Sequence, residues 1–359
     1  MARQVIDTTT NNGAYIGDPA NVAFGKVNDN FAELYEAQDR LSSRTGKNKL
    51  INGTMNFWQR GTSFNLAPSA GAYTADRWAF NTGAGISVNV SRASLSPGEV
   101  DQFPLAMAVG VSAVGGGVNM RQSIELVNTM AGKSMTLSFW ARANFAGMQL
   151  GVRGQQVFGS GGSANAGLTG GGNVSLNLAW TRHTVQLAAP SIAGKTAGAN
   201  NAVQLIFDYL SSGTYWITGV QLEEGNARTD FDYPLYGDEL VRCQRYYENS
   251  FPISSAPTNG AGSAGHTAVG FTAGAVRTQG IDFKVTKRAN PSIVLYSPVE
   301  IPAAGGRWAL YNGSAWSSGA ASIVTLSPAS FTTQMDYGSG ITFGSSYITS
   351  GNWAADAEF

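Results

Sequence analysis

Between Ala20 and Leu41 apolar residues recur every three or four positions, which is the period of one face of an α-helix. Steps of four and three alternate along this face, as they do at the a and d positions of a coiled coil. The members of this seam are Ala20, Phe24, Val27, Phe31, Leu34, Gln38 and Leu41. Asp18 can cap the helix, and Pro19 suits its first position. The pattern predicts a helix that pairs with copies of itself, with Gln38 fixing the register; packing on its own domain is the alternative.

From Leu50 onward the period changes to two, because apolar and polar residues alternate in short runs. In residues 135–143 one face carries only apolar side chains, those of Met135, Leu137, Phe139 and Ala141. Comparable runs occupy residues 86–90, 118–126, 183–187, 202–210 and 214–225. Strands of this kind bury one face and leave the other in water. About eight of them, joined by glycine-rich turns, predict a mostly β protein containing a jelly-roll β-sandwich.

The rest of the chain predicts two further segments. Residues 237–250 indicate a short polar helix that follows Pro234 and is capped by Asp238. Beyond it the chain has alternating runs of its own, enough for a smaller C-terminal β-sandwich. The predicted domains are an N-terminal helical segment (1–45), the jelly roll (46–234), a joint helix (235–250) and the C-terminal sandwich (251–359).

Composition and charge narrow the class of protein. The chain has 359 residues, of which 43% are hydrophobic and only 13% are charged, and 45 are glycine. Its 23 basic residues balance 23 acidic ones, so the net charge does not favour binding to nucleic acid or to an anionic membrane. No run is apolar enough for a signal peptide or a membrane helix. We therefore expect synthesis in a reducing cytoplasm, no membrane insertion and no nucleic-acid partner.

Few residues are of the types that act as nucleophiles or general bases in catalysis. Cys243 is the single cysteine, and His183 and His266 are the only histidines. Without a G-x-S-x-G elbow we expect both histidines to be ordinary strand or loop residues, and Cys243 to be buried and inert. We predict no catalytic residue, no cofactor and no metal site, and hence a protein that is not an enzyme.

Acidic residues do gather where the jelly roll is predicted to end. They are Glu223, Glu224, Asp230, Asp232, Asp238 and Glu239. Solvated loop charges are the prediction, and two alternatives stay open. Paired carboxylates could cleave a polysaccharide, or some of the oxygens could hold a structural Ca²⁺.

Aromatic side chains are the better candidates for binding. Trp308, Tyr311 and Trp316 surround a predicted hairpin turn at Asn312-Gly313. Flat rings with polar edges suit the C–H faces and hydroxyl rims of sugars, so these three predict a glycan or receptor site. In the alternative, Trp308 and Trp316 pair across the hairpin into the core. The remaining tryptophans are expected in the core or in inter-subunit packing: Trp58, Trp78, Trp140, Trp180 and Trp216.

Several strings resemble a known family. "NKLINGTMNFWQRGTSF" (48–64) and "YTADRWAF" (73–80) resemble the opening of the carbohydrate-binding-module-like jelly roll of bacteriophage tail fibres. "YWITGVQLEEGNARTDFDYPLYGDELVRCQRYYE" (215–248) is similar to the end of that module and the joint after it. "GDPANVAFGKVNDNFAELYEA" (17–37) is similar to the segments by which such fibres attach to the virion. "FKVTKRANPSIVLYSP" and "WAADAEF", at 283–298 and 353–359, are similar to their distal ends.

The resemblance implies a homotrimeric receptor-binding protein of the virion, made in the host cytoplasm and carried on the phage tail. Its implied partners are copies of itself, tail or baseplate proteins at the N-terminal segment, and a host surface glycan or outer-membrane receptor. We expect the C-terminal sandwich to be the receptor-binding tip. A structural tail or baseplate decoration protein is one alternative, and a surface polysaccharide hydrolase is another.

Overall fold

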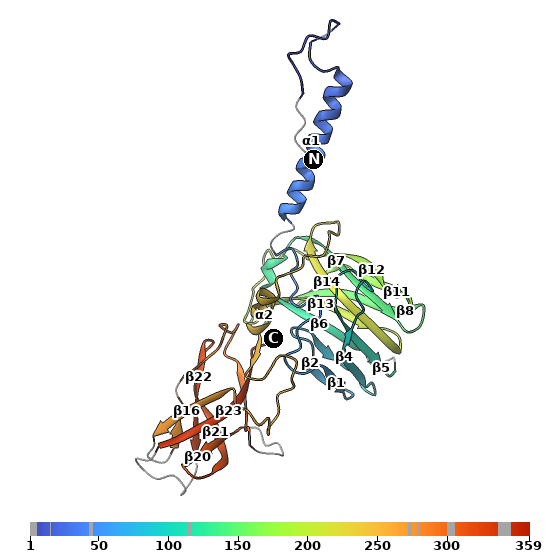
Figure 1. Cartoon of the computed structure of the whole chain (residues 1–359). Helices are drawn as coiled ribbons and strands as arrows, with labels where there is room; N and C mark the ends of the chain where they lie inside the picture. Colours follow the sequence, from blue (N-terminus) through green and yellow to red (C-terminus); the bar gives the residue numbers. More distant parts are fainter. Residues whose placement is uncertain are drawn as a thin grey trace. The chain divides into compact units, whose positions relative to one another are not determined.

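The computed structural model describes residues 6–14, 16–42, 46–113, 117–271, 275–278, 280–299, 306–336 and 346–359 (Figure 1). The protein is mostly β, with several antiparallel sheets and few helices. Contacts divide it into two compact units, residues 1–48 with 229–232 and residues 49–228 with 233–359.

The first unit contains helix α1 (Ala20–Ser42), which confirms the helix predicted from the apolar period. Instead of the predicted cap, Asp18 accepts hydrogen bonds from the backbone N–H of Asp7 at 2.8 Å and from Lys26 Nζ at 2.6 Å. The predicted seam is accessible, since Phe24, Phe31 and Leu34 are 69%, 52% and 59% exposed.

Ala20 is also exposed and Val27 is half-buried. Gln38 and Leu41 belong to α1, but their side chains lie outside the described residues. Within the described parts of the chain, no helix is both long and apolar enough to cross a membrane.

The second unit begins with a β-sandwich of two seven-stranded antiparallel sheets. The first sheet has the order β1 (Ser63–Leu66), β4 (Val88–Ser94), β5 (Leu105–Val111), β14 (Gly213–Glu224), β7 (Ser134–Ala143), β12 (Thr181–Ala188) and β10 (Thr169–Gly170). The second has the order β11 (Gly172–Leu176), β8 (Met148–Val157), β13 (Ala202–Tyr209), β6 (Val118–Glu125), β3 (Ala79–Asn81) and β2 (Gly71–Tyr73), with β9 (Ala166–Gly167) on β8. A 3-10 turn, η1 (Val127–Thr129), follows β6.

One hydrophobic core fills the space between these two sheets. Alternation places Leu137 and Phe139 of β7 inward, as the sequence predicts, and both are fully buried. Phe139 meets Phe207 of β13 edge to face, with ring centroids 5.2 Å apart. The two-sheet sandwich predicted from the period of two is therefore confirmed, and its strands leave their alternate residues on an outer face.

The segment after the sandwich differs from the predicted joint helix. Helix α2 (Tyr236–Gln244) is shorter, and β15 (Tyr247–Asn249) is a strand that pairs with Ala354–Asp356. No side chain caps α2: Leu235 stands at the cap position, and Asp238 lies in the first turn. The prediction of helix through Ser250 was wrong because a distant strand supplies hydrogen-bond partners that local sequence does not show.

The C-terminal strands form one nine-stranded antiparallel sheet in place of the predicted second sandwich. The strands after β15 are β16 (His266–Phe271), β17 (Ala275–Arg277), β18 (Ile281–Asp282), β19 (Ser292–Tyr296), β20 (Arg307–Tyr311), β21 (Trp316–Leu326), β22 (Ser330–Asp336) and β23 (Ser346–Asp356). The first half of β23 pairs with β16 and β20, and its second half pairs with β15 and β19. This change of partners lets one sheet enclose small cores of its own, the larger around Trp308, Phe331 and Trp353.

Candidate binding surface

Tryptophan side chains occupy the outer face of the first sheet. Trp140 in β7 and Trp216 in β14 are only half-buried, although their neighbours Phe139 and Tyr215 are fully buried in the core. Trp180, which directly precedes β12, is also half-buried. Strand alternation explains the arrangement, because a residue next to an inward-facing one must face outward. Core packing is therefore wrong for Trp140, Trp180 and Trp216, whereas Trp58 and Trp78 are indeed buried. Inter-subunit packing, the other expectation, stays a prediction for the first three.

Arg142 holds two of these indoles in place. Its guanidinium lies 4.4 Å from the ring centroid of Trp216 and 5.4 Å from that of Trp180. Trp180 Nε1 donates a hydrogen bond of 3.1 Å to Glu99 Oε1, and the same oxygen is 3.9 Å from Arg142 Nη2. Hydrogen bonds from the Ser96 backbone N–H and from Trp180 keep the pKa of Glu99 below its usual value. The charges of Arg142 and Glu99 are thus matched, and the rings of Trp180 and Trp216 are oriented before any ligand arrives.

A bulge in β14 brings a fourth ring onto the same face. The register with β7 shifts between Thr218 and Gln221, and Gly219 has a φ of +60°. A Cβ at Gly219 would lie 2.6 Å from the Phe103 ring and 3.1 Å from Trp140, so only glycine admits Phe103 here. Phe103 in turn stacks on Tyr233, with centroids 5.3 Å apart. We call Phe103, Trp140, Trp180, Trp216 and Tyr233 the aromatic face.

The predicted hairpin of β20 and β21 is present, but Trp308 does not lie with the other two rings. Trp308 has no exposed surface, and its Nε1 donates a 3.0 Å hydrogen bond to the Asn352 carbonyl. It sits directly over Gly351, where any side chain would collide with its indole. Trp308 is therefore a core residue of the C-terminal sheet and not part of the predicted binding site.

Tyr311 and Trp316 face each other across the turn of this hairpin, with ring centroids 5.3 Å apart. Trp316 is 47% exposed, and the two residues remain a prediction for receptor contact. Trp308 lies opposite Gly319, so the alternative of a Trp308–Trp316 pair was wrong.

The cysteine and the two histidines, which were considered as catalytic residues, are packed against neighbouring side chains. Cys243 is buried, as expected, and burial raises the pKa of its thiol. His183 lies on β12 and stacks on Phe139, and burial lowers its pKa. His266 begins β16, where burial likewise lowers its pKa.

The acidic residues were predicted to be solvated loop charges, but this was wrong for Glu223 in β14 and Glu239 in α2, which are both 3% exposed. Glu224 pairs with Lys133 at 2.7 Å, whereas the buried Glu239 accepts hydrogen bonds from the Asn52 backbone N–H and from Arg242. Among the described residues, no group of three or more His, Cys, Asp or Glu side chains is placed to hold a metal ion.

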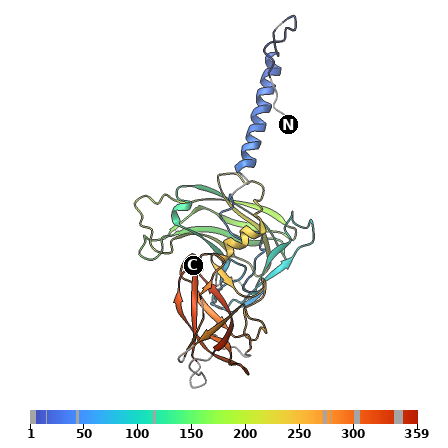
Figure 2. The same cartoon turned by 60° about the vertical axis from the view of Figure 1, so that its left-hand side comes forward.

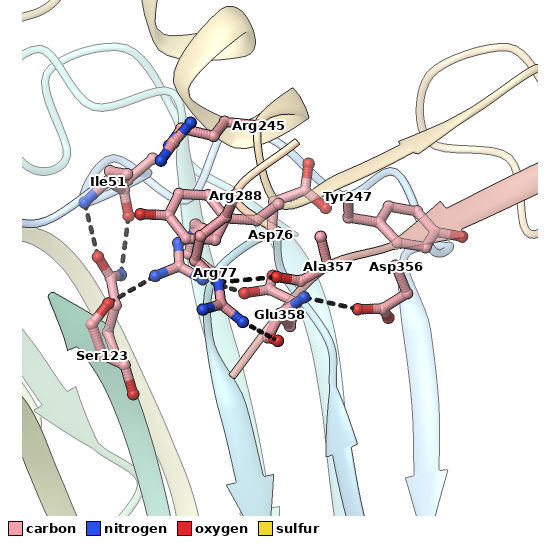
Figure 3. Close-up of polar contacts among 12 residues, drawn as sticks. Ile51, Asp76, Arg77, Ser123, Arg245, Tyr247, Arg288, Asp356, Ala357 and Glu358 are labelled. Carbon is pink, nitrogen blue, oxygen red and sulfur yellow. Dashed lines mark hydrogen bonds and ion pairs between the residues drawn. The ribbon is translucent and has the colours of Figure 1, made fainter. Parts of the chain in front are cut away.

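A cluster of buried charges joins the sandwich to the last residues of β23 and the tail that follows (Figure 3). Arg60 lies 3.0 Å from Asp356, 3.6 Å from Glu358 and 3.8 Å from Asp76. Arg77, which is 1% exposed, pairs with Glu358 and donates a hydrogen bond to the Ser123 carbonyl. Figure 2 shows the C-terminus at the junction of the sandwich and the C-terminal sheet. The cluster fastens these two parts of the second unit together.

The same cluster explains the strings that resemble tail fibres. Arg60, from the "WQRGTSF" string, lies 3.6 Å above the ring of Tyr247, and Arg77, from "YTADRWAF", lies 3.3 Å above Tyr246. Both tyrosines belong to the "CQRYY" string. The arginines and tyrosines of these strings are therefore needed for packing at the junction. The strings indicate this domain arrangement and not a ligand site.

The cluster predicts that stability depends on pH through Asp76. Its side chain is buried beside Arg60 and near the carboxylate of Glu358, and burial raises its pKa to about 6. Below that pH the folded state holds a proton on Asp76, whereas the unfolded chain, in which the pKa of this group has its ordinary value of 3.8, has released it. The folded state should therefore gain stability from this group as the pH falls from 7 to 5. We expect the melting temperature of the wild type to rise over this interval relative to Asp76→Asn; a constant difference would contradict this.

Comparisons with known proteins identify no family. No family model and no curated protein sequence matches this chain. Among solved structures, the tailspike protein 4 domain of bacteriophage CBA120 is similar over 50% of this chain and 22% of its own, with 18% identity and a TM-score of 0.32. A putative sugar-binding protein from Bacteroides thetaiotaomicron is 15% identical over 50% of this chain and 100% of its own, with a TM-score of 0.32.

The family 11 carbohydrate-binding module from Clostridium thermocellum, in complex with a mixed-linked tetrasaccharide, is 15% identical. That similarity covers 46% of this chain and 97% of the module, with a TM-score of 0.29. These scores are too low to define a function for this chain.

Proposed function

We propose that this protein is a non-enzymatic phage tail fibre that attaches the virion to a bacterial surface by binding a glycan. The observation that carries the proposal is the aromatic face, where half-buried tryptophans and a stacked arginine lie on the outer side of a rigid sheet. Indole faces pack on the C–H surfaces of sugars, and their surroundings supply hydrogen bonds to hydroxyl groups. The resemblance of the N-terminal strings supports attachment of residues 1–45 to tail or baseplate proteins.

The proposed assembly is a homotrimer held by the seam of α1. Phe24, Phe31 and Leu34 expose apolar surface at heptad positions, and a coiled coil would bury it. A shallow sugar site binds weakly on its own. Three linked copies raise the effective concentration for the second and third contacts, which increases avidity by roughly 10² to 10⁴ without any new contact.

Replacing Trp216 with alanine tests the site. We expect the apparent affinity for glycan-bearing cells to fall about 30-fold or more, the usual effect of truncating a central aromatic anchor. Labelled protein can be titrated on a panel of bacterial strains and read by flow cytometry. Trp316→Ala is the comparison variant, because it removes an exposed tryptophan from the hairpin, which is the other predicted receptor site.

Three other results would change the assignment. If only Trp316→Ala loses binding, the receptor site is the hairpin of β20 and β21. If no strain is labelled, a tail decoration protein becomes the better description. Release of reducing ends from strain polysaccharides would show a hydrolase.

A further inference from the structure

A groove lies beside the aromatic face on the outer side of the first sheet. It has a volume of about 490 Å³, within the range of roughly 300–1,000 Å³ usual for ligand sites. Four outward residues on neighbouring strands form a row across it, Asn65, Asn89, Gly110 and Thr214. With strands about 4.8 Å apart, the row spans about 14 Å.

This row is continuous with the aromatic face. Trp216 follows Thr214 by two residues in β14, so both side chains point to the same side of the sheet. Ala108 pairs with Trp216 just as Gly110 pairs with Thr214. Ala108 and Gly110 have almost no side chain. The outer surface of the sheet is therefore recessed between the side chains of Asn89 and Trp216. A ligand lying across the strands can therefore touch the amide row and the Trp216 indole together.

The polar groups of the groove are neutral. No lining residue carries a charge, and the outward polar side chains are Asn65, Asn89, Ser87, Ser112 and Thr214. Asn89 Nδ2 donates a 2.6 Å hydrogen bond to Asn65 Oδ1, which orients both amides. That bond leaves the NH₂ group of Asn65 as a donor and the carbonyl oxygen of Asn89 as an acceptor for a ligand in the groove. Sugar hydroxyl groups can satisfy both, whereas a carboxylate can satisfy only a donor.

The arginine beside Trp216 does not alter this chemistry. Arg142, opposite Trp216 on β7, is stacked between two indoles and lies near Glu99. Its charge is therefore already matched on this face. We propose that the groove is a subsite for a neutral, extended saccharide that crosses the strands and ends on Trp216. This inference rests on the proposed glycan-binding function and names the class of sugar.

Gly110→Leu tests the subsite by filling it. Gly110 does not have a positive φ, and a Cβ there would first meet Asn89 Cβ at 3.8 Å, an ordinary contact. The variant should therefore fold, which its melting temperature checks. Affinity gel electrophoresis of the full chain with neutral polysaccharides (galactan, mannan, xylan and mixed-linkage glucan) and acidic ones (polygalacturonate and hyaluronan) provides the measurement.

We expect the wild type to be retarded by a neutral polysaccharide and Gly110→Leu to lose about tenfold or more in affinity. Gly167→Leu is the matched control, because this strand glycine of the second sheet also has open space and should bind as the wild type. Asn65→Leu, which removes the exposed amide, should weaken binding as well and covers the case in which Gly110→Leu does not fold.

Unchanged binding by both Gly110→Leu and Asn65→Leu would overturn the subsite and leave glycan binding intact. Retardation only by acidic polysaccharides would overturn the neutral class. If no polysaccharide retards the wild type and no strain is labelled, the proposed function fails together with the subsite.

Discussion

Replacing Arg77 with alanine should lower the free energy of unfolding by about 3–5 kcal/mol. Arg77 is 1% exposed, and its removal leaves the carboxylate of Glu358 buried beside a single remaining arginine, Arg60. The guanidinium also stacks on Tyr246 and bonds the Ser123 carbonyl, so packing and hydrogen bonding are lost together. The expected fall in melting temperature, measured by calorimetry or circular dichroism, is roughly 6–15 °C.

Two comparisons make this prediction specific to the buried cluster. Arg153→Ala removes an arginine that is 52% exposed and pairs with Asp208 on the surface, and it should cost about 1 kcal/mol or less. The double variant Arg77→Ala with Glu358→Ala should cost less than the sum of its single variants, because it leaves no unpaired charge from this pair. An Arg77→Ala protein as stable as Arg153→Ala would mean that the cluster does not hold the junction together.

Phe31→Asp should convert the proposed homotrimer to monomers. A charge at the centre of the seam would have to be buried three times in one coiled coil, and each lost phenylalanine forfeits about 1.5–3 kcal/mol of burial. Size-exclusion chromatography with light scattering should give the mass of one chain, 37.6 kDa, in place of three times that mass. Binding to whole cells should fall by roughly 10² to 10⁴ as avidity is lost.

Ala32→Asp is the matched control for this experiment. Ala32 is exposed on α1 but lies off the seam, so the same charge there should leave the trimer intact. Trimers that persist in Phe31→Asp would show that the β domains carry the assembly, and the helix would then act mainly as an anchor. Monomeric wild-type protein would contradict the proposed self-association directly.

Only part of the aromatic face could be predicted from the sequence. The alternation in residues 135–143 assigns Phe139 to the core and, by the same rule, Trp140 to the outer face, so the aromatic face had a signal in the sequence. We expected Trp140 in the core or in inter-subunit packing, and against the first of these the two-residue period was the better guide. The approach of Phe103 had no such signal, because it depends on a bulge at Gly219.

Long-range pairing decided the rest. Arg60 and Asp356 are 296 positions apart, and Arg77 and Glu358 are 281 apart, so no local pattern could join them. Trp308 is buried because β23 brings Gly351 beneath its ring, and β15 is a strand because the end of β23 pairs with it. The sequence alone determined the helix, its seam and the inward faces of the sandwich strands, since these follow from the 3.6- and 2-residue periods of the backbone. Only the tertiary structure decided which strands became neighbours, and with that the buried charge cluster, the groove and the rings left in reach of a ligand.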